Sequence, residues 1–274
     1  MRNRSAYFWV IAIVITLGSA TYQRLTGPTY PMRGSGVVHG EEIRYRLVRS
    51  WETNSDARVK IDVPDTAFSG YLRYKRLNVE EDWTAIPMKR SEGELTGRLP
   101  AQPPAGKLIY YVDIAYNGKT VVLNREPVVI RFKGEVPAII LIPHILLMFI
   151  AMLFSNRTGI EALANGKKLV SYSLVTVIAL FLGGMILGPT VQKFAFGEFW
   201  TGWPVGNDLT DNKTLIAFIA WIVALLFALS KRRSARWWVL AASIALLLVY
   251  LIPHSLWGSE LDYSTGTIET GKGQ

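Results

Sequence analysis

Five blocks of apolar residues, separated by polar segments, organise the 274-residue chain. Uncharged apolar runs near the roughly 20 residues that a membrane-crossing helix needs cover residues 136–154, 169–191, 215–230 and 237–254. A shorter block, residues 6–22, follows Arg2 and Arg4, which fits a signal anchor or a secretory signal peptide that ends in small residues. We favour the uncleaved anchor, and the pattern then predicts an integral membrane protein with five spans.

Residues 24–135, between the first two apolar blocks, follow a different pattern in which apolar and polar positions alternate. The alternation is visible in Ile43-Tyr45-Leu47 and Val59-Ile61-Val63, and a period of two is typical of half-buried strands. Asn117-Gly118 lies between two such runs and is a strong signal for a two-residue hairpin turn. About seven short strands with this spacing predict an all-β sandwich of immunoglobulin or fibronectin type III character.

The net charge of +9 is concentrated in short loops between the apolar blocks. Arg2 and Arg4 precede the first block, Arg157, Glu161, Lys167 and Lys168 follow the second, and Lys231, Arg232, Arg233 and Arg236 follow the fourth. These are alternate connections, and Lys and Arg are retained on the cytoplasmic side of membrane proteins. The charge therefore indicates topology and excludes a nucleic-acid partner: the N-terminus is cytoplasmic, and residues 24–135 and the C-terminus are external.

These observations predict an α+β membrane protein in a bacterial-type inner membrane, with the lipid bilayer as its first partner. Its predicted parts are an anchor helix (1–23), an exported β-sandwich (24–135), a four-helix membrane domain (136–254) and an external tail (255–274). The chain has no cysteine, which excludes disulfides and thiol chemistry. The exported domain offers no Ser–His–Asp set or phosphate loop, and its His39 is interpreted as a surface residue.

Two of the three histidines belong to a repeated tetrapeptide, Leu-Ile-Pro-His, that ends at His144 and at His254. The predicted topology places both imidazoles toward the outer membrane face. An ionisable residue within a span usually marks a function or has a partner, so His144 is the more informative. The alternative is a neutral imidazole bonded to a neighbouring helix, with Met148 and Met152 as packing. We expect Pro143 to kink or open its turn and Pro253 to kink or end the fifth span.

Glycines and aromatic residues mark the third span and the loop that follows it. Gly184 and Gly188 form a small-residue stripe that permits close helix packing, or alternatively leaves room for a flat cofactor. The next segment contains Trp200 and Trp203 and leads to Asp208 and Asp211, either of which can cap the fourth span. Interfacial Trp preference explains these rings in part.

The run Phe196-Gly197-x-Phe199-Trp200-x-x-Trp203, followed by Asp208 and a helix, resembles the tryptophan-rich external loop of haem-handling cytochrome c assembly membrane proteins. In that family the loop lies between two spans and is flanked by external histidines that ligate haem iron. The resemblance implies that Trp200, Trp203 and Asp208 are the loop positions, with His144 and His254 as axial ligands. The chain departs from the family at Phe196, in the spacing before Asp208, in its five spans and in its β-sandwich.

The resulting hypothesis is a b-type haem between His144 and His254 on the outer face, in haem handling or electron transfer. Two other hypotheses remain open. One is a non-enzymatic scaffold whose β-sandwich recruits exported partners. The other is a metal-dependent membrane enzyme with mixed nitrogen and oxygen ligands, drawn from His254, Asp208, Asp211, Glu260 and Asp262. The sequence names no reaction.

Overall fold

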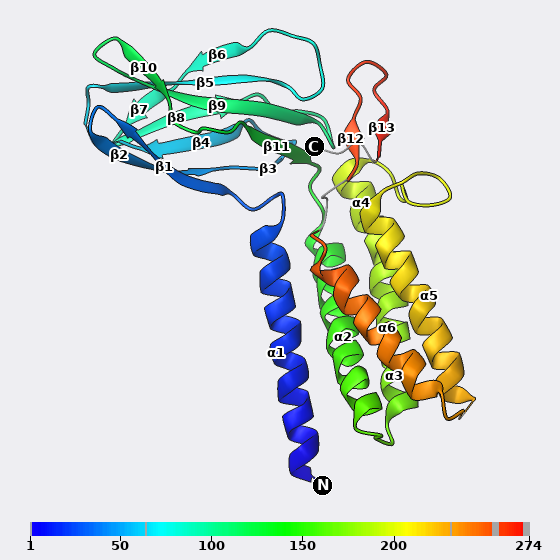
Figure 1. The fold of residues 1–274 in the computed structure, drawn as a ribbon. Helices are drawn as coiled ribbons and strands as arrows, with labels where there is room; N and C mark the ends of the chain where they lie inside the picture. Colours follow the sequence, from blue (N-terminus) through cyan, green and yellow to red (C-terminus); the bar gives the residue numbers. More distant parts are fainter. Residues whose placement is uncertain (1, 64, 231, 254–257, 271–274) are drawn as a thin grey trace.

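The computed structural model describes residues 2–63, 65–230, 232–253 and 258–270. A β domain stands on one end of a set of long helices, and the N-terminus lies at the opposite end (Figure 1). The chain is therefore an α+β protein with a β domain between its first two long helices.

Two sheets form the β domain. The first runs in the order β1 (Met32–Val38), β2 (Glu41–Leu47), β4 (Ala57–Asp62), β8 (Glu94–Leu99) and β7 (Lys89–Ser91). The second runs in the order β3 (Ser50–Glu52), β11 (Val128–Lys133), β9 (Lys107–Tyr116), β5 (Phe68–Arg76) and β6 (Thr84–Pro87), with β10 (Lys119–Val122) also on β9. All pairs are antiparallel except β3 with β11. The strands outnumber the seven expected, because short edge strands are added to both sheets.

Alternating side chains of the two sheets meet in one apolar core. In β4 the residues alternate strictly between buried and exposed, with Val59 and Ile61 inside, as their pattern predicts. In β9 the core-facing residues are Leu108, Tyr110, Val112 and Ile114. Asn117 and Gly118 both have positive φ and connect Tyr116 to Lys119 across the β9–β10 hairpin, so this predicted turn is confirmed.

Within the described residues, four helices are long and apolar enough to cross a membrane. They are α1 (Arg2–Thr26), α2 (Ala138–Leu163), the continuous run α3 (Leu169–Leu180), η1 (Phe181–Leu187) and α4 (Gly188–Phe196), and α5 (Leu209–Leu229). A fifth apolar helix, α6 (Ala235–Leu251), is shorter. Helix α2 continues through Pro143, whereas α6 ends two residues before Pro253. A small hairpin, β12 (Glu260–Leu261) with β13 (Ile268–Glu269), follows it.

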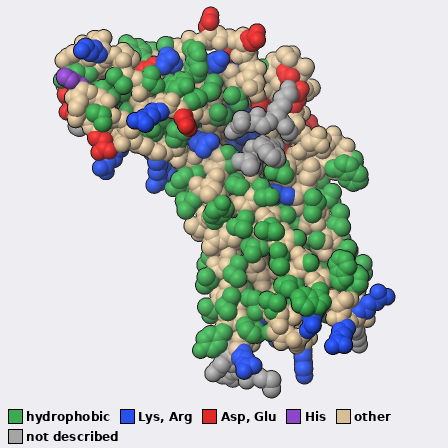
Figure 2. All heavy atoms as spheres, viewed as in Figure 1, with side chains coloured by type: hydrophobic (Ala, Val, Ile, Leu, Met, Phe, Trp, Pro, Cys, Tyr) green, Lys and Arg blue, Asp and Glu red, His purple; other side chains and the backbone are tan. Residues whose placement is uncertain are grey.

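The helices pack through small residues and leave large apolar side chains outside. Buried alanines surround Trp221 and Met152 between α2, α3, α5 and α6, which is the small-residue packing expected of helices in lipid. Ile139, Ile216 and Leu248 are among the exposed apolar side chains. Figure 2 shows hydrophobic side chains over the helical part and Lys and Arg side chains at its far end.

The sequence places Arg157 and Glu161 in a short basic loop after the second apolar block. In the structure neither residue lies in a loop. Helix α2 runs on to Leu163, so both residues are buried in its last turns, where Arg157 Nη1 donates to Glu161 Oε2 at 2.6 Å. Phe8, Trp9 and Tyr172 surround the guanidinium. The two residues are one helical turn apart. Because their charges are paired inside the protein, helix α2 continues beyond the uncharged apolar run that ends at residue 154.

Candidate outer-face cavity

A cavity of about 560 Å³ lies where the helices meet the β domain, and we call it the outer cavity. Helices α1, α2 and α5 and the continuous run of η1 and α4 each supply several lining residues. Helix α6 supplies Tyr250, and β11 supplies Arg131. Its lining combines apolar residues with polar and charged ones. The apolar lining includes Leu141, Ile145, Met148, Phe149, Gly184, Gly188 and Val191, and the polar lining includes Gln23, Arg24, Arg131, Gln192, Asp208 and Asp211.

His144 lies in the wall of this cavity, on the second turn of α2. Its Nδ1 atom is 2.9 Å from the carbonyl oxygen of Gly183. A carbonyl can only accept a hydrogen bond, so in the neutral ring Nδ1 carries the proton and Nε2 has the free lone pair. Metal-ligating histidines are commonly oriented in this way by a carbonyl on the other nitrogen. The contact also matches the alternative in which the ring bonds a neighbouring helix.

A stretch of π-helix, η1, supplies that carbonyl. Gly183 O also accepts from the N–H of Gly188, five residues on, so the helix is locally wider than an α-helix. An added Cβ on Gly183 would lie 2.8 Å from Leu147 Cβ, whereas one on Gly188 would be 3.8 Å from His144 Cε1. Gly183 therefore permits close packing on α2, while Gly184 and Gly188 line the cavity. In the predicted stripe itself, an added Cβ on Gly184 would lie 2.9 Å from Thr214 Cγ2 of α5, so Gly184 shows the close helix packing expected of the stripe.

Two carboxylates of the cavity lining lie at the start of α5. Asp208 is the N-cap and accepts from the N–H groups of Thr210 and Asp211, at 2.7 and 3.4 Å. Asp211 accepts from the N–H of Thr201 at 2.7 Å, which fixes the preceding loop. Asp208 and Asp211 are both buried. The predicted capping role of Asp208 is confirmed, and both carboxylates also face the cavity.

Arg131 closes the cavity from the side of the β domain. Its Nη2 donates to the carbonyl of Ser259 at 2.6 Å, and its Cζ lies 3.8 Å from the centre of the Phe196 ring. Burial lowers the pKa of Arg131 to about 10, a shift opposed by Asp208 and Glu260, so the side chain stays cationic at neutral pH. Among the described residues its buried Nε has no hydrogen-bond partner.

The two tryptophans of the loop have different surroundings. Trp200 lines the outer cavity, and its Nε1 donates to the carbonyl of Trp203 at 3.0 Å. Trp203 is 68% exposed and is not among the lining residues described. The loop therefore contributes one tryptophan to the cavity, together with Phe196, and His254 lies outside the described residues.

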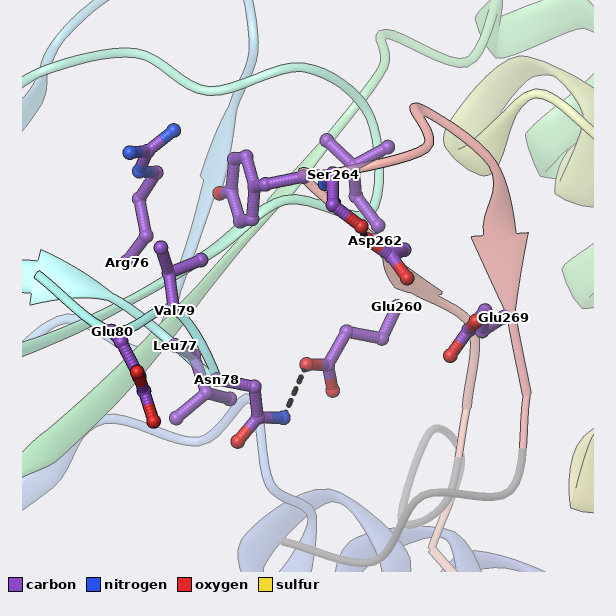
Figure 3. A pocket seen from close by; sticks show the side chains of 11 residues that line it. Arg76, Leu77, Asn78, Val79, Glu80, Glu260, Asp262, Ser264 and Glu269 are labelled. Carbon is purple, nitrogen blue, oxygen red and sulfur yellow. Dashed lines mark hydrogen bonds between the residues drawn. The ribbon is translucent and has the colours of Figure 1, made fainter.

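Glu260 and Asp262, named for the alternative metal site, line another pocket of about 380 Å³ between the β12–β13 hairpin and the end of β5. Figure 3 shows Glu260 directed toward Asn78, to which it is hydrogen-bonded at 2.6 Å, with Asp262 and Glu269 along the hairpin. Glu260 also forms a buried ion pair with Lys107 at 2.9 Å. Asp208 and Asp211 are thus in one pocket and Glu260 and Asp262 in another, and no group of three possible ligands comes together among the described residues.

Sequence reasoning identified His144, Trp200, Asp208 and Asp211 and missed the basic residues of the same cavity. Arg24 and Arg131 are not among the candidate site residues that the sequence indicates. Arg131 has one weak signal: it sits between Ile130 and Phe132 in a strand with few polar residues. A scan of protein-family models and a search of curated proteins both found no match to the chain.

Proposed function

We propose that the chain is a haem-binding membrane protein that holds b-type haem in the outer cavity and serves in haem handling or electron transfer. The observation that carries the proposal is the orientation of His144, whose Nδ1 is bonded to Gly183 O at the wall of a large, half-apolar cavity. A neutral imidazole with a free Nε2 is an axial ligand for haem iron.

The residues present fit the chemistry of such a group. The cavity, at about 560 Å³, is within the roughly 300–1,000 Å³ of small-molecule sites. Its apolar lining, with Gly184 and Gly188, suits a flat macrocycle, and the guanidinium of Arg131 suits carboxylate side groups. Haem would supply a one-electron couple, and the protein would tune it through the axial imidazole and the apolar wall. His254 is the proposed second axial ligand.

The proposed topology has five membrane crossings, with α6 as the last of them. Support comes from the basic residues Arg4, Lys168 and Arg236, which lie at the ends of α1, α3 and α6 away from the β domain. This end is cytoplasmic in a bacterial-type inner membrane, and the outer cavity, the β domain and the tail are external. We assign the β domain to the immunoglobulin or fibronectin type III class of sandwiches.

A haem titration of the protein in mild detergent tests the proposal. Wild type is expected to give a Soret band that saturates near one haem per chain. His144→Ala should bind haem at least about tenfold more weakly, a loss of about 1.4 kcal/mol or more. His39→Ala is the matched control, because His39 is an exposed turn residue beside Tyr116 in the β domain. Equal titrations for His144→Ala and wild type would reject the site and favour the scaffold hypothesis.

A further inference from the structure

A second hollow, of about 580 Å³, lies between the outer end of α1 and strands β3 and β11, and we call it the basic cleft. Four basic side chains line it, Arg24, Arg49, Arg131 and Lys133, against the single carboxylate of Glu52. Ser50 and Ser55 add hydroxyl groups. Arg24 and Arg131 line both this cleft and the outer cavity, whereas Arg49 and Lys133 belong to the cleft alone among the described lining residues.

These four basic side chains are not matched by nearby acidic side chains. Within the described part of the chain, none of them has a carboxylate within 4.0 Å. The Nε atoms of Arg49 and Arg131 are buried there without a hydrogen-bond partner. Only 7% of Arg131 is exposed. Burial lowers the pKa of Arg49, which reflects the cost of keeping its charge away from water.

Arg131 is buried and Arg49 and Lys133 are half-buried, whereas Arg24 is exposed. A buried cation without an anionic partner destabilises a protein, because it has lost hydration that a neutral hydrogen bond, such as that from Arg131 to Ser259, replaces only in part. A bound anion would offset that cost. The guanidinium group presents parallel N–H donors that match the oxygens of phosphate, and hydroxyl groups complete such sites. The cleft therefore has the charge and the donors for a phosphate group.

The position of the cleft specifies where that phosphate would be met. Helix α1 ends at Thr26 with Arg24 in its last turn, so the cleft opens where the apolar helix gives way to the β domain. Lipid headgroups occupy this level of a bilayer. On the proposed topology the cleft is external. The tendency of Lys and Arg to stay on the cytoplasmic side therefore does not explain its basic residues.

We propose that the basic cleft binds a phosphate group, supplied by an anionic phospholipid headgroup or by a soluble phosphate compound. Arg49 and Lys133 bind the phosphate from the β domain, and Arg24 and Arg131 bind it from the side of the membrane. The site adjoins the outer cavity but needs no haem, and Arg49 lies outside the haem cavity.

The test uses the full-length protein, delipidated in detergent. Native mass spectrometry counts phosphatidylglycerol bound after addition of the lipid, with phosphatidylcholine of the same acyl chains as the zwitterionic comparison. Titration calorimetry measures the affinity of the protein for inorganic phosphate and for glycerol phosphate. Arg49→Gln and, independently, Lys133→Gln remove one cation each. Arg98→Gln is the matched control, because Arg98 is exposed on β8 in the other sheet.

Wild type is expected to retain phosphatidylglycerol in preference to phosphatidylcholine, and Arg49→Gln and Lys133→Gln to lose at least about tenfold in affinity, while Arg98→Gln does not. If the two variants lose affinity for phosphatidylglycerol alone, the site binds a lipid headgroup. If they also lose affinity for inorganic phosphate, the ligand is a soluble phosphate compound. An unchanged Soret titration in Arg49→Gln separates this site from haem binding. No binding by wild type, or equal binding by Arg49→Gln, Lys133→Gln and wild type, would overturn the proposal.

Discussion

Arg131 of the β domain and Ser259 of the C-terminal tail are joined by a hydrogen bond of 2.6 Å, from the guanidinium Nη2 to the backbone carbonyl. The hydroxyl of Ser259 in turn donates to Asp208 Oδ2 at 3.2 Å, at the start of α5. Three segments distant in sequence therefore meet at the rim of the outer cavity. The tail is part of the cavity's frame, and its attachment to the β domain can be tested.

The Lys107–Glu260 ion pair is predicted to hold the tail hairpin on the β domain. Glu260→Gln leaves the ammonium of Lys107 buried without its charged partner, and loss of one member of a buried pair costs about 3–5 kcal/mol. Thermal unfolding should show this loss as a lower midpoint. The double variant Lys107→Met/Glu260→Met should regain most of it, because no lone charge remains. A double variant as unstable as Glu260→Gln would contradict this account.

Tyr263 is predicted to ionise late. Its hydroxyl donates to Gln102 Oε1 at 2.9 Å, and burial raises the pKa of Tyr263 to about 12 from about 10. A raised pKa means that the folded state holds this proton more tightly, so the stability from Tyr263 is complete below pH 10 and is lost as pH rises through 12. Absorbance titration of wild type minus Tyr263→Phe should show one phenolate appearing near pH 12. A difference spectrum that titrates near pH 10 would refute the partly buried position of the ring.

Gly183 and Gly188, which are joined by the π-helical hydrogen bond, are predicted to differ in their tolerance of alanine. Gly183→Ala would place a methyl 2.8 Å from Leu147 Cβ and should destabilise the protein by about 1–3 kcal/mol through overpacking. Gly188→Ala meets its nearest atoms at 3.6 and 3.8 Å, which are ordinary contacts, and should be neutral or stabilising by up to about 1 kcal/mol. Unfolding midpoints of the two variants provide the comparison, and equal effects would show that the helices do not approach as described.

Asp208 is predicted to stabilise the start of α5 chiefly as a cap. Asp208→Ala removes the acceptor for two N–H groups and the partner of Ser259, and should cost about 1–2 kcal/mol. Asp208→Asn keeps an oxygen at the cap and should cost only a few tenths of that amount. Denaturant titration of both variants measures the difference. If Asn proved as damaging as Ala, the carboxylate charge rather than the cap would be responsible.

The elements predicted from sequence were those fixed by local patterns. Asn117-Gly118 needs only its own backbone preference to form a hairpin, and Asp208 only the free N–H groups of the next turn. The role of Arg131 depends on Ser259, 128 residues away, and nothing near Arg131 in the sequence encodes that partner. Likewise, β9 carries apolar residues on both faces, so alternation could not show that Tyr110 rather than Tyr111 points inward.

The features of the outer cavity also divide into those that the sequence revealed and those that it did not. His144 and Trp200 stood out because a histidine within a span and a tryptophan-rich loop are rare. The π-helix that supplies Gly183 O was not predicted, because nothing in the apolar run of residues 169–191 distinguishes its wider turn from an α-helical one. The buried Arg157–Glu161 pair was assigned to a loop, because charge was read as a span boundary.

Imidazole rescue of His144→Gly tests the central claim most directly, which is that the Nε2 of His144 is available to a ligand in the outer cavity. With haem added, the variant is expected to lack the wild-type Soret and reduced-state bands, and millimolar imidazole should restore them by occupying the space of the missing ring. His39→Gly, which removes an exposed ring in the β domain, should match wild type throughout. Identical haem spectra for His144→Gly and wild type without imidazole would contradict the account.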